Sequence, residues 1–318
     1  MVTTLPYGSW PSPLTADLLA TGGTRLGSPR LVGREVWWTE GIATEGGRQA
    51  IVRTAGPVAL PPAGGAEGPP APSVPADRVT VLPAPFNARS RVHEYGGSSW
   101  SVVPAPGPDG QGPLVVFVNF ADQRVHALRE GEQPRPLTPV GPEIESAHGP
   151  SLRWADPTVV TLADGTTEVW WVCEDHAGLV GRTAGADGSS PDGAAPHPDA
   201  EVTLPIDVDG APHIERSIVA VPLDGSAAED PAALRRITPA SRFVAHPRLS
   251  PDGTRLAWIS WEHPQMPWDG TELHVAPLLD GSAGEGEIIA GGTDVSVLQP
   301  EWLDDERLLF LSDVTGWW

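Results

Sequence analysis

The stretch from His246 to Leu278 constrains the fold more than any other part of the sequence. It reads HPRLSPDGTRLAWISWEHPQMPWDGTELHVAPL, which predicts a strand, a tight SPDG turn, a second strand, a proline-stiffened loop and a third strand. Short apolar runs bounded by Gly, Pro, Asp and Ser are typical of β-strands. Glycine and proline account for 36 and 37 of the 318 residues, and long helical periodicity is missing. We therefore expect an all-β fold.

Weaker versions of this pattern recur along the chain, and most units offer four short apolar runs. Pro29, Pro150, Pro247 and Pro300 stand at comparable places near the first run of four of these units. One four-stranded sheet cannot bury both of its faces alone, so repeats that pack against one another are the natural solution. The pattern therefore predicts a β-propeller.

The predicted propeller domain covers residues 24–318 and follows an N-terminal lead over residues 1–23. We expect about four and a half four-stranded blades, with the propeller truncated in the fifth. The blades are placed at roughly 24–83, 93–138, 150–238, 245–291 and 298–318, the last one partial. Two low-complexity insertions, 55–76 and 177–211, interrupt this pattern, and their compositions are unsuited to a packed core.

The loops of the predicted blades differ between the two rims. In a four-stranded meander, the loops after the second strand and the crossovers between blades lie on one rim. Here these loops are long and carry charged and aromatic residues, whereas the other rim carries SPDG-type turns. Decorated loops on a rigid scaffold commonly carry function, so we expect the functional site on the first rim.

The bulk composition excludes several classes of function. A net charge of −21 argues against nucleic acid binding, which needs a basic surface. Cys173 is the only cysteine, so neither an internal disulfide nor a multi-cysteine metal site is expected. The sequence starts without a secretory signal pattern and contains no apolar run of about 20 residues. We expect a cytoplasmic protein with no membrane contact, no metal and no cofactor.

Three groups of residues on the decorated rim are candidates for function. His93 and Glu94 precede paired glycines, which suggest close backbone approach or a positive φ. Glu174, Asp175 and His176, beside Cys173, end a strand; adjacent residues there point to opposite faces, so the cluster is unsuited to one metal ion, and Asp175 and His176 remain the candidates. Each of these groups has a structural alternative, namely a crossover, a strand end or a loop anchor.

The third group lies in the loop WEHPQMPWDG. Pro264 and Pro267 fix the backbone there, and Trp261 and Trp268 are able to pack as a rigid lobe. This lobe serves either blade packing or the docking of a further domain. His263 is a weak candidate for a general base.

Several strings of the chain resemble the propeller of prolyl-oligopeptidase-family serine peptidases. They are RSRVHEYGGSSW, VNFADQRVHAL, VCEDH, PRLSPDGTRLAWISWEHPQMPWDGTELHVA and QPEW…SDVTGWW. The likeness is closest to the bacterial dipeptidyl-aminopeptidase and acylaminoacyl-peptidase-like branch. It implies the N-terminal part of a seven-bladed propeller that caps a C-terminal α/β-hydrolase domain and admits short peptides to it.

The resemblance also gives the candidate residues a role. His93, Glu94, Asp175, His176, His263 and Trp268 become candidates for substrate gating or for the interface with the hydrolase domain. Glu94 in particular is a candidate for recognising the free amine of a peptide, an expectation that comes from the exopeptidase chemistry of the family.

The chain lacks the family's catalytic motif. A nucleophile elbow requires G-x-S-x-G between a strand and a helix, and no such string occurs. No catalytic residue of the family is carried onto this chain, and the hydrolase domain is expected to be absent from it and the chain inactive alone. A second hypothesis is a stand-alone propeller that acts as a protein-interaction scaffold. A third, weaker one is a metal-dependent propeller hydrolase.

Overall fold

A computed structural model of the chain describes residues 24–57, 77–104, 110–144, 149–162, 164–180 and 214–316, with a few isolated positions near the N-terminus. Most of the two predicted insertions, 55–76 and 177–211, and of the predicted lead, 1–23, lies outside these described residues. The chain divides into two compact units, Met1–Val81 and Leu82–Trp318.

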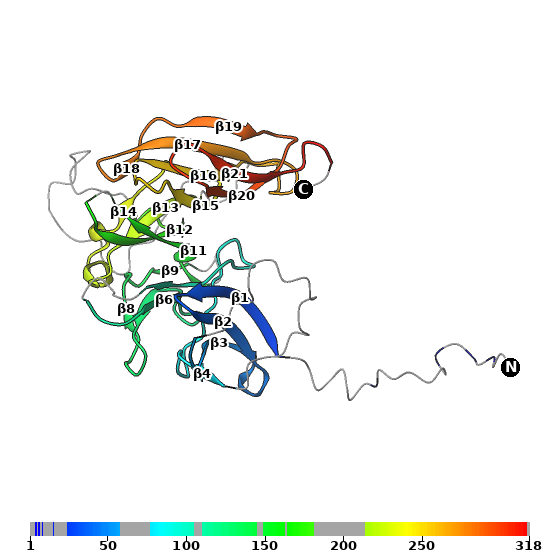
Figure 1. The fold of residues 1–318 in the computed structure, drawn as a ribbon, viewed down its shortest axis with the longest axis vertical. Helices are drawn as coiled ribbons and strands as arrows, with labels where there is room; N and C mark the ends of the chain where they lie inside the picture. The colour runs from blue at the N-terminus through cyan, green and yellow to red at the C-terminus, as the bar shows by residue number, and fades with distance from the viewer. Residues whose placement is uncertain are drawn as a thin grey trace. The chain divides into compact units, whose positions relative to one another are not determined.

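The first unit contains one antiparallel sheet in the order β1-β2-β3-β4 (Figure 1). Its strands are β1 (Arg25–Val32), β2 (Glu35–Ile42), β3 (Arg48–Thr54) and β4 (Arg78–Thr80), and a short 3-10 helix, η1 (Ala43–Glu45), follows β2. Trp38 pairs with Val52, and both are buried with Ala50 in one apolar cluster. Since paired residues on neighbouring strands share a face, this sheet has a distinct apolar face.

The second unit contains further antiparallel sheets, again built from strands that follow one another in the sequence. One has β5 (Trp100–Val103), β6 (Leu114–Val118), β7 (Val125–Leu128) and β8 (Arg135–Pro136); the next has β11 (Leu152–Thr161), β12 (Thr167–Asp175), β13 (Glu215–Val221) and β14 (Arg235–Arg236). A third has β15 (Phe243–Leu249), β16 (Arg255–Trp261), β17 (Glu272–Leu279) and β18 (Ser282–Ala283), and β19 (Glu287–Gly291) also pairs with β17.

Two smaller sheets and two short helices complete the second unit. The sheets are β20 (Val297–Trp302) with β21 (Leu308–Ser312), and β9 (Glu143–Ile144) with β10 (Gly149–Pro150). The helices η3 (Ser226–Ala228) and η4 (Pro231–Ala233) lie between β13 and β14. The all-β prediction is confirmed.

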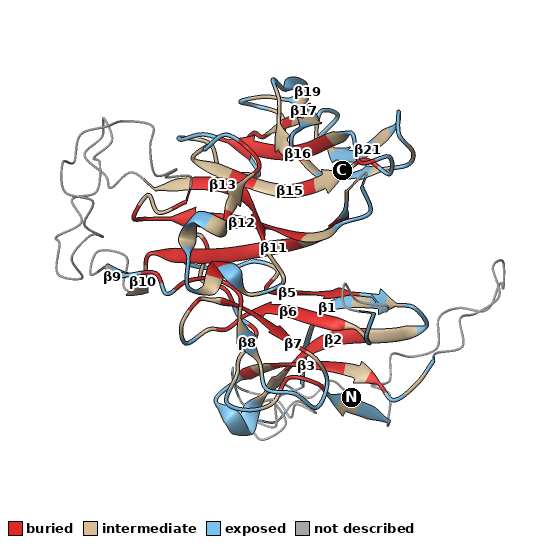
Figure 2. Cartoon of the chain, turned by 90° about the vertical axis from the view of Figure 1, so that its left-hand side faces the viewer, coloured by how far each residue is buried: buried red, intermediate tan, exposed pale blue. Residues whose placement is uncertain are grey.

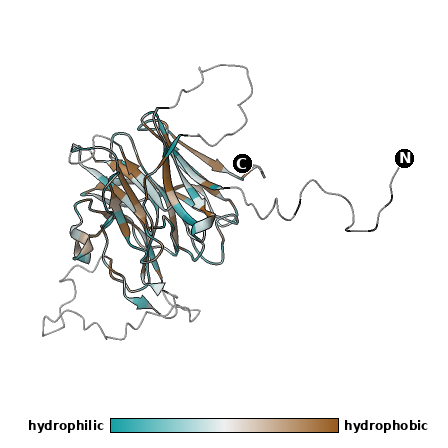
Figure 3. Cartoon of the chain, turned by 90° about the horizontal axis from the view of Figure 1, so that it is seen from below, coloured by the Kyte–Doolittle hydropathy of each residue, from teal (hydrophilic) through white to brown (hydrophobic). Residues whose placement is uncertain are grey.

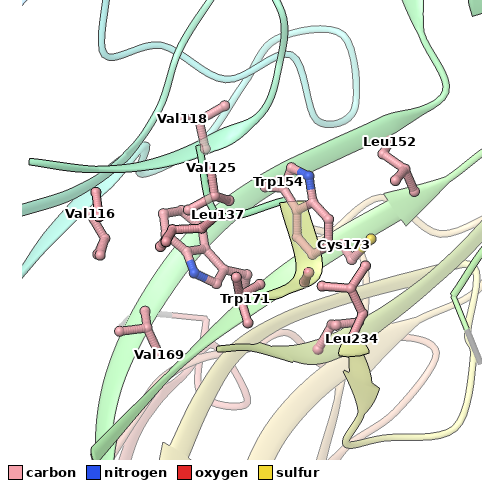
Figure 4. Packing of buried hydrophobic residues seen from close by; sticks show 14 of the residues in the cluster. Val116, Val118, Val125, Leu137, Leu152, Trp154, Val169, Trp171, Cys173 and Leu234 are labelled. Atoms are coloured by element: carbon pink, nitrogen blue, oxygen red, sulfur yellow. The ribbon is translucent and has the colours of Figure 1, made fainter. Parts of the chain in front are cut away.

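Successive sheets of the second unit share apolar cores, so the central strands are buried on both faces (Figure 2). Side chains of a strand alternate between faces. In β12, Val169, Trp171 and Cys173 therefore pack with residues of β6 and β7, as Figure 4 shows. Trp170 and Val172 point the other way and pack with residues of β15 and β16. The neighbouring residues Trp170 and Trp171 therefore pack into two different apolar cores.

The strand β16 repeats this arrangement one sheet further along. Leu256 and Trp258 belong to the core shared with β12, whereas Ala257, Ile259 and Trp261 pack toward β20 and β21. Apolar residues, brown in Figure 3, recur along the strands. The expectation that stacked sheets bury one another's faces agrees with this packing.

The first strand of four sheets contains the same irregularity. In β1, β11, β15 and β20 the pairing register shifts, and a residue with positive φ precedes a proline at each shift. The pairs are Ser28-Pro29, Asp156-Pro157, His246-Pro247 and Gln299-Pro300. A bulge accommodates proline, which is unable to donate to the strand ladder. The sequence-based choice of Pro150 as a member of this series is wrong, since Pro150 lies in β10 and Pro157 occupies the equivalent position.

Candidate functional site

A buried carboxylate, Glu174, organises the end of β12. Its side chain is 1% exposed. Oε1 lies 2.7 Å from Nε2 of His176 and 3.4 Å from an Nη of Arg153, and Oε2 accepts hydrogen bonds from Nε of Arg216 at 2.8 Å and from the backbone N–H of His93 at 3.0 Å. Four segments distant in the sequence therefore meet at one side chain.

The charge of Glu174 is stabilised strongly. Burial raises the pKa of this carboxyl, but the hydrogen bond from His176 and the charge of Arg216 outweigh burial and lower the pKa to about 2. Glu174 is therefore ionised at neutral pH, and its partners hold it in place.

Arg153 connects this buried cluster to the solvent-facing Glu94. The Arg153 side chain is fully buried, and it hydrogen-bonds Oε1 of Glu94 and the backbone oxygen of Arg91. Oε2 of Glu94 lies 3.3 Å from the guanidinium of Arg91. Burial raises the pKa of Glu94, yet the hydrogen bond and charge of Arg153 and the charge of Arg91 hold it below its ordinary value. Both carboxylate oxygens thus already have guanidinium partners, although 57% of the side chain is exposed.

The loop that carries His93 and Glu94 has a constrained backbone. Both residues adopt left-handed conformations, with φ of 55° and 66°. Gly96 follows at φ 86°, and a Cβ there would lie 2.7 Å from the backbone oxygen of Ser90. Only glycine fits this close approach without strain, so the predicted role of the paired glycines holds for Gly96.

An aromatic cluster lies beside the charged groups. Phe243 and Trp261 are stacked, with ring centroids 5.0 Å apart, and the His93 ring lies 5.3 Å from Phe243. The guanidinium of Arg216 lies 4.7 Å above Phe243, and His263 meets the same ring edge-on at 5.2 Å. Burial and the charge of Arg216 lower the pKa of His93 to about 4, against the opposing effect of Glu174. His93 is therefore neutral at pH 7.

A cavity of about 330 Å³ opens beside this aromatic cluster, entirely within the second unit. Its walls come from the loop after His93, from the bulges of β11 and β15, and from β16 and β20. Apolar side chains and backbone form most of the surface. Asp156 and His246, the two bulge residues, lie at the wall, and an oxygen of Asp156 accepts the backbone N–H of His246 at 2.8 Å.

The structure brings three of the six predicted site residues together. His93, Glu94 and His176 meet around Glu174 and Arg153. Asp175 faces away from them, and its carboxylate accepts the backbone N–H groups of Ala177 at 3.0 Å and Val180 at 2.8 Å. Burial raises the pKa of Asp175. Asp175 therefore anchors the loop after β12.

The remaining two predicted residues lie in the loop after β16. His263 is exposed and contacts Phe243, and Trp268 is 65% exposed. Trp261, which ends β16, stacks on Phe243 and is 6% exposed, so it differs sharply in burial from Trp268.

Sequence reasoning named Glu174 in the strand-end cluster without choosing it as a site candidate, and it missed Arg153, Arg216 and Phe243. Strand alternation puts Glu174 in phase with the buried Trp170 and Val172, but both faces of β12 are buried, so alternation does not single out Glu174. The partners of Glu174 come from segments up to 81 residues away in the sequence, as His93 does, and residue spacing does not predict such contacts. Among the described residues, no group of three or more His, Cys, Asp or Glu is arranged to hold a metal ion. No helix in the same residues is long and apolar enough to cross a membrane.

The chain is similar along its whole length to solved peptidase structures. A puromycin-hydrolysing peptidase from Mycobacterium tuberculosis is 38% identical with a TM-score of 0.72, and the match covers 100% of this chain and 39% of that one. The chain belongs to the prolyl oligopeptidase family. A puromycin hydrolase structure matches at 36% identity and TM-score 0.70, over 100% of this chain and 40% of that one. No protein-family model and no curated protein matches the sequence.

A further match is a serine-to-alanine mutant of puromycin hydrolase complexed with PGG, at 34% identity and TM-score 0.70. It covers 100% of this chain and 40% of that chain. The chain thus spans about two fifths of the length of the solved peptidases it matches. The family resemblance inferred from the sequence strings is confirmed.

Proposed function

We propose that this chain is the propeller portion of a serine peptidase that hydrolyses short peptides. In this proposal it admits substrate and docks a C-terminal α/β-hydrolase domain that supplies the catalytic serine, aspartate and histidine. The observation that carries the proposal is the identity of 38% and 36%, over the whole chain, to puromycin-hydrolysing peptidases. The gathering of His93, Glu94 and His176 around one buried carboxylate supports a rim site that faces substrate.

The substrate type depends on what Glu94 recognises. A dipeptidyl aminopeptidase must bind a free amine, and an exposed carboxylate suits that role, whereas an acylaminoacyl peptidase binds a blocked N-terminus. In this chain Arg153 and Arg91 already pair with Glu94, so an amine would have to share its oxygens with them. We propose the aminopeptidase type, with Glu94 as the residue that contacts the amine.

We also propose that the sheets are blades of a seven-bladed propeller in a cytoplasmic protein. Under this proposal the blades follow the ranges inferred from the sequence, and β20 and β21 begin the fifth. The sequential antiparallel order within each sheet and the shared cores of the second unit support the assignment. A structure of the longer protein with its hydrolase domain would count the blades directly.

The test compares the purified chain with the same chain extended by a C-terminal hydrolase domain. Aminoacyl and acylaminoacyl p-nitroanilides are the substrates. We expect no hydrolysis by the chain alone, because it has no G-x-S-x-G string, and fluorophosphonate-sensitive hydrolysis of the aminoacyl compound by the extended protein. Turnover by the chain alone, or none by the extended protein, would contradict the proposal.

A further inference from the structure

The cavity beside His93 has the size of a site for one side chain or one small ring. Its volume of about 330 Å³ is at the lower end of the range for small-molecule sites. Val92, Val172, Val244, Ile259 and Leu298 line it, and Trp261 forms an aromatic wall. An apolar group placed there would leave water and contact apolar atoms on several sides.

The electrostatics of the wall disfavour a charged occupant. Burial and the charge of Arg216 lower the pKa of His93, and burial lowers the pKa of His246, so both rings are neutral at pH 7. One oxygen of Asp156 is already engaged by the backbone N–H of His246. A cation that entered the cavity would exchange its hydration shell for contact with one carboxylate, that of Asp156, in mostly apolar walls, which is costly.

The walls are also held in place before any ligand arrives. The backbone N–H of Asp156 donates to the oxygen of Ser98 at 2.7 Å, which fixes the β11 bulge against the loop before β5. Trp261 is stacked on Phe243 with an angle of 4° between the rings. A preorganised apolar cavity loses little entropy on binding.

We propose that this cavity is a subsite for an uncharged apolar side chain, aromatic or branched aliphatic, of a peptide ligand. The proposal rests on the proposed function for the peptide nature of the ligand. It places the polar backbone of the peptide toward the rim that carries Glu94, and one apolar side chain against Trp261 and Leu298. The cavity would therefore add selectivity for a side chain on the propeller side of the substrate.

Disulfide capture tests this inference without catalytic turnover. Ala245 lines the cavity, and an Ala245→Cys variant would place a thiol at its wall. Cys173, the only native cysteine, is fully buried, and burial raises the pKa of its thiol, so it competes poorly in exchange. The matched control is Ala283→Cys, which is also half-buried but lies outside the cavity.

The variants would be equilibrated with benzyl and aminoethyl disulfide reagents under mild reduction, and the adducts counted by mass spectrometry. We expect about tenfold or greater preference for the benzyl adduct at position 245, from the burial of one ring, and a ratio near one at position 283. Adding Leu298→Phe to the Ala245→Cys variant narrows the cavity and should reduce the preference severalfold.

Equal ratios at positions 245 and 283, or a preference for the aminoethyl adduct at 245, would overturn the subsite. So would an undiminished benzyl preference after Leu298→Phe. Peptidase assays test the proposed function separately from the subsite. If the extended protein hydrolyses no peptide, the proposed function fails, but a preference for the benzyl adduct at position 245 would still establish an apolar binding site.

Discussion

Replacing Glu174 by glutamine should destabilise the second unit strongly and change how its stability depends on pH. The side chain is 1% exposed and accepts from His176, Arg216 and the backbone of His93. Glutamine keeps the shape but presents one oxygen and an NH₂ group to these donors. Breaking a buried ion pair by removing one partner costs about 3–5 kcal/mol.

The lowered pKa of Glu174 gives a second estimate of how much this side chain stabilises the fold. The Glu174 pKa falls from an ordinary value of 4.5 to about 2 in the folded chain. A depression of this size corresponds to about 3 kcal/mol of stability, because one pKa unit is worth about 1.4 kcal/mol. The unfolded chain takes up the proton first as the pH falls. This stability is therefore fully present above pH 4.5 and is lost as the pH falls toward 2.

Urea unfolding of the purified chain, followed by tryptophan fluorescence from pH 7 to pH 2, measures both effects. Glu174→Gln should lose about 3 kcal/mol or more at pH 7, and the difference from the parent should shrink to near zero at pH 2. The exposed Glu306→Gln is the matched control and should change stability by less than about 0.5 kcal/mol. A Glu174→Gln cost under about 1 kcal/mol at pH 7, or a cost that does not depend on pH, would refute the reasoning.

Three further changes follow from the same loop and its partners. Burial lowers the pKa of His93 to about 4, so the unfolded chain binds the proton first and the parent should lose stability as the pH falls from 6.5 to 4. His93→Phe should not show this loss, which melting curves at pH 7 and 4.5 would check. Gly96→Ala should cost about 1–3 kcal/mol, since φ is 86° and the Cβ meets a backbone oxygen, whereas Gly112→Ala, with open space around it, should be near neutral; equal melting temperatures would contradict this. Arg153→Met should raise the pKa of Glu94 toward its ordinary value, which NMR titration of the carboxyl measures; an unchanged pKa would contradict the pairing.

The strands were predictable because the residue types that favour strands also suit a position buried between sheets. The stretch His246–Leu278 was expected to hold three strands joined by a tight turn and a proline-stiffened loop, and the structure has β15, β16 and β17 there. β-Branched and aromatic residues between turn residues favour strands, and both faces of β16 are covered by neighbouring sheets.

The site was less predictable, since it depends on contacts through space. Arg153 and Arg216 sit inside strands, where a charged residue usually faces solvent, yet they are buried against Glu174. Alternation along β12 does not separate Asp175 from Glu174, because both faces of this strand are buried. His93 and Glu94 adopt left-handed conformations in the folded loop, where the backbone N–H of His93 donates to Glu174. Neither residue type predicts a positive φ from the sequence.

The double burial of β12 and β16 has a consequence for how this protein tolerates change. Each of these strands contributes odd positions to one core and even positions to another, so neither has a face on which substitutions are harmless. Inserting or deleting a single residue would exchange the occupants of two cores at once. Variation in length among relatives of this chain should therefore be confined to the segments between strands.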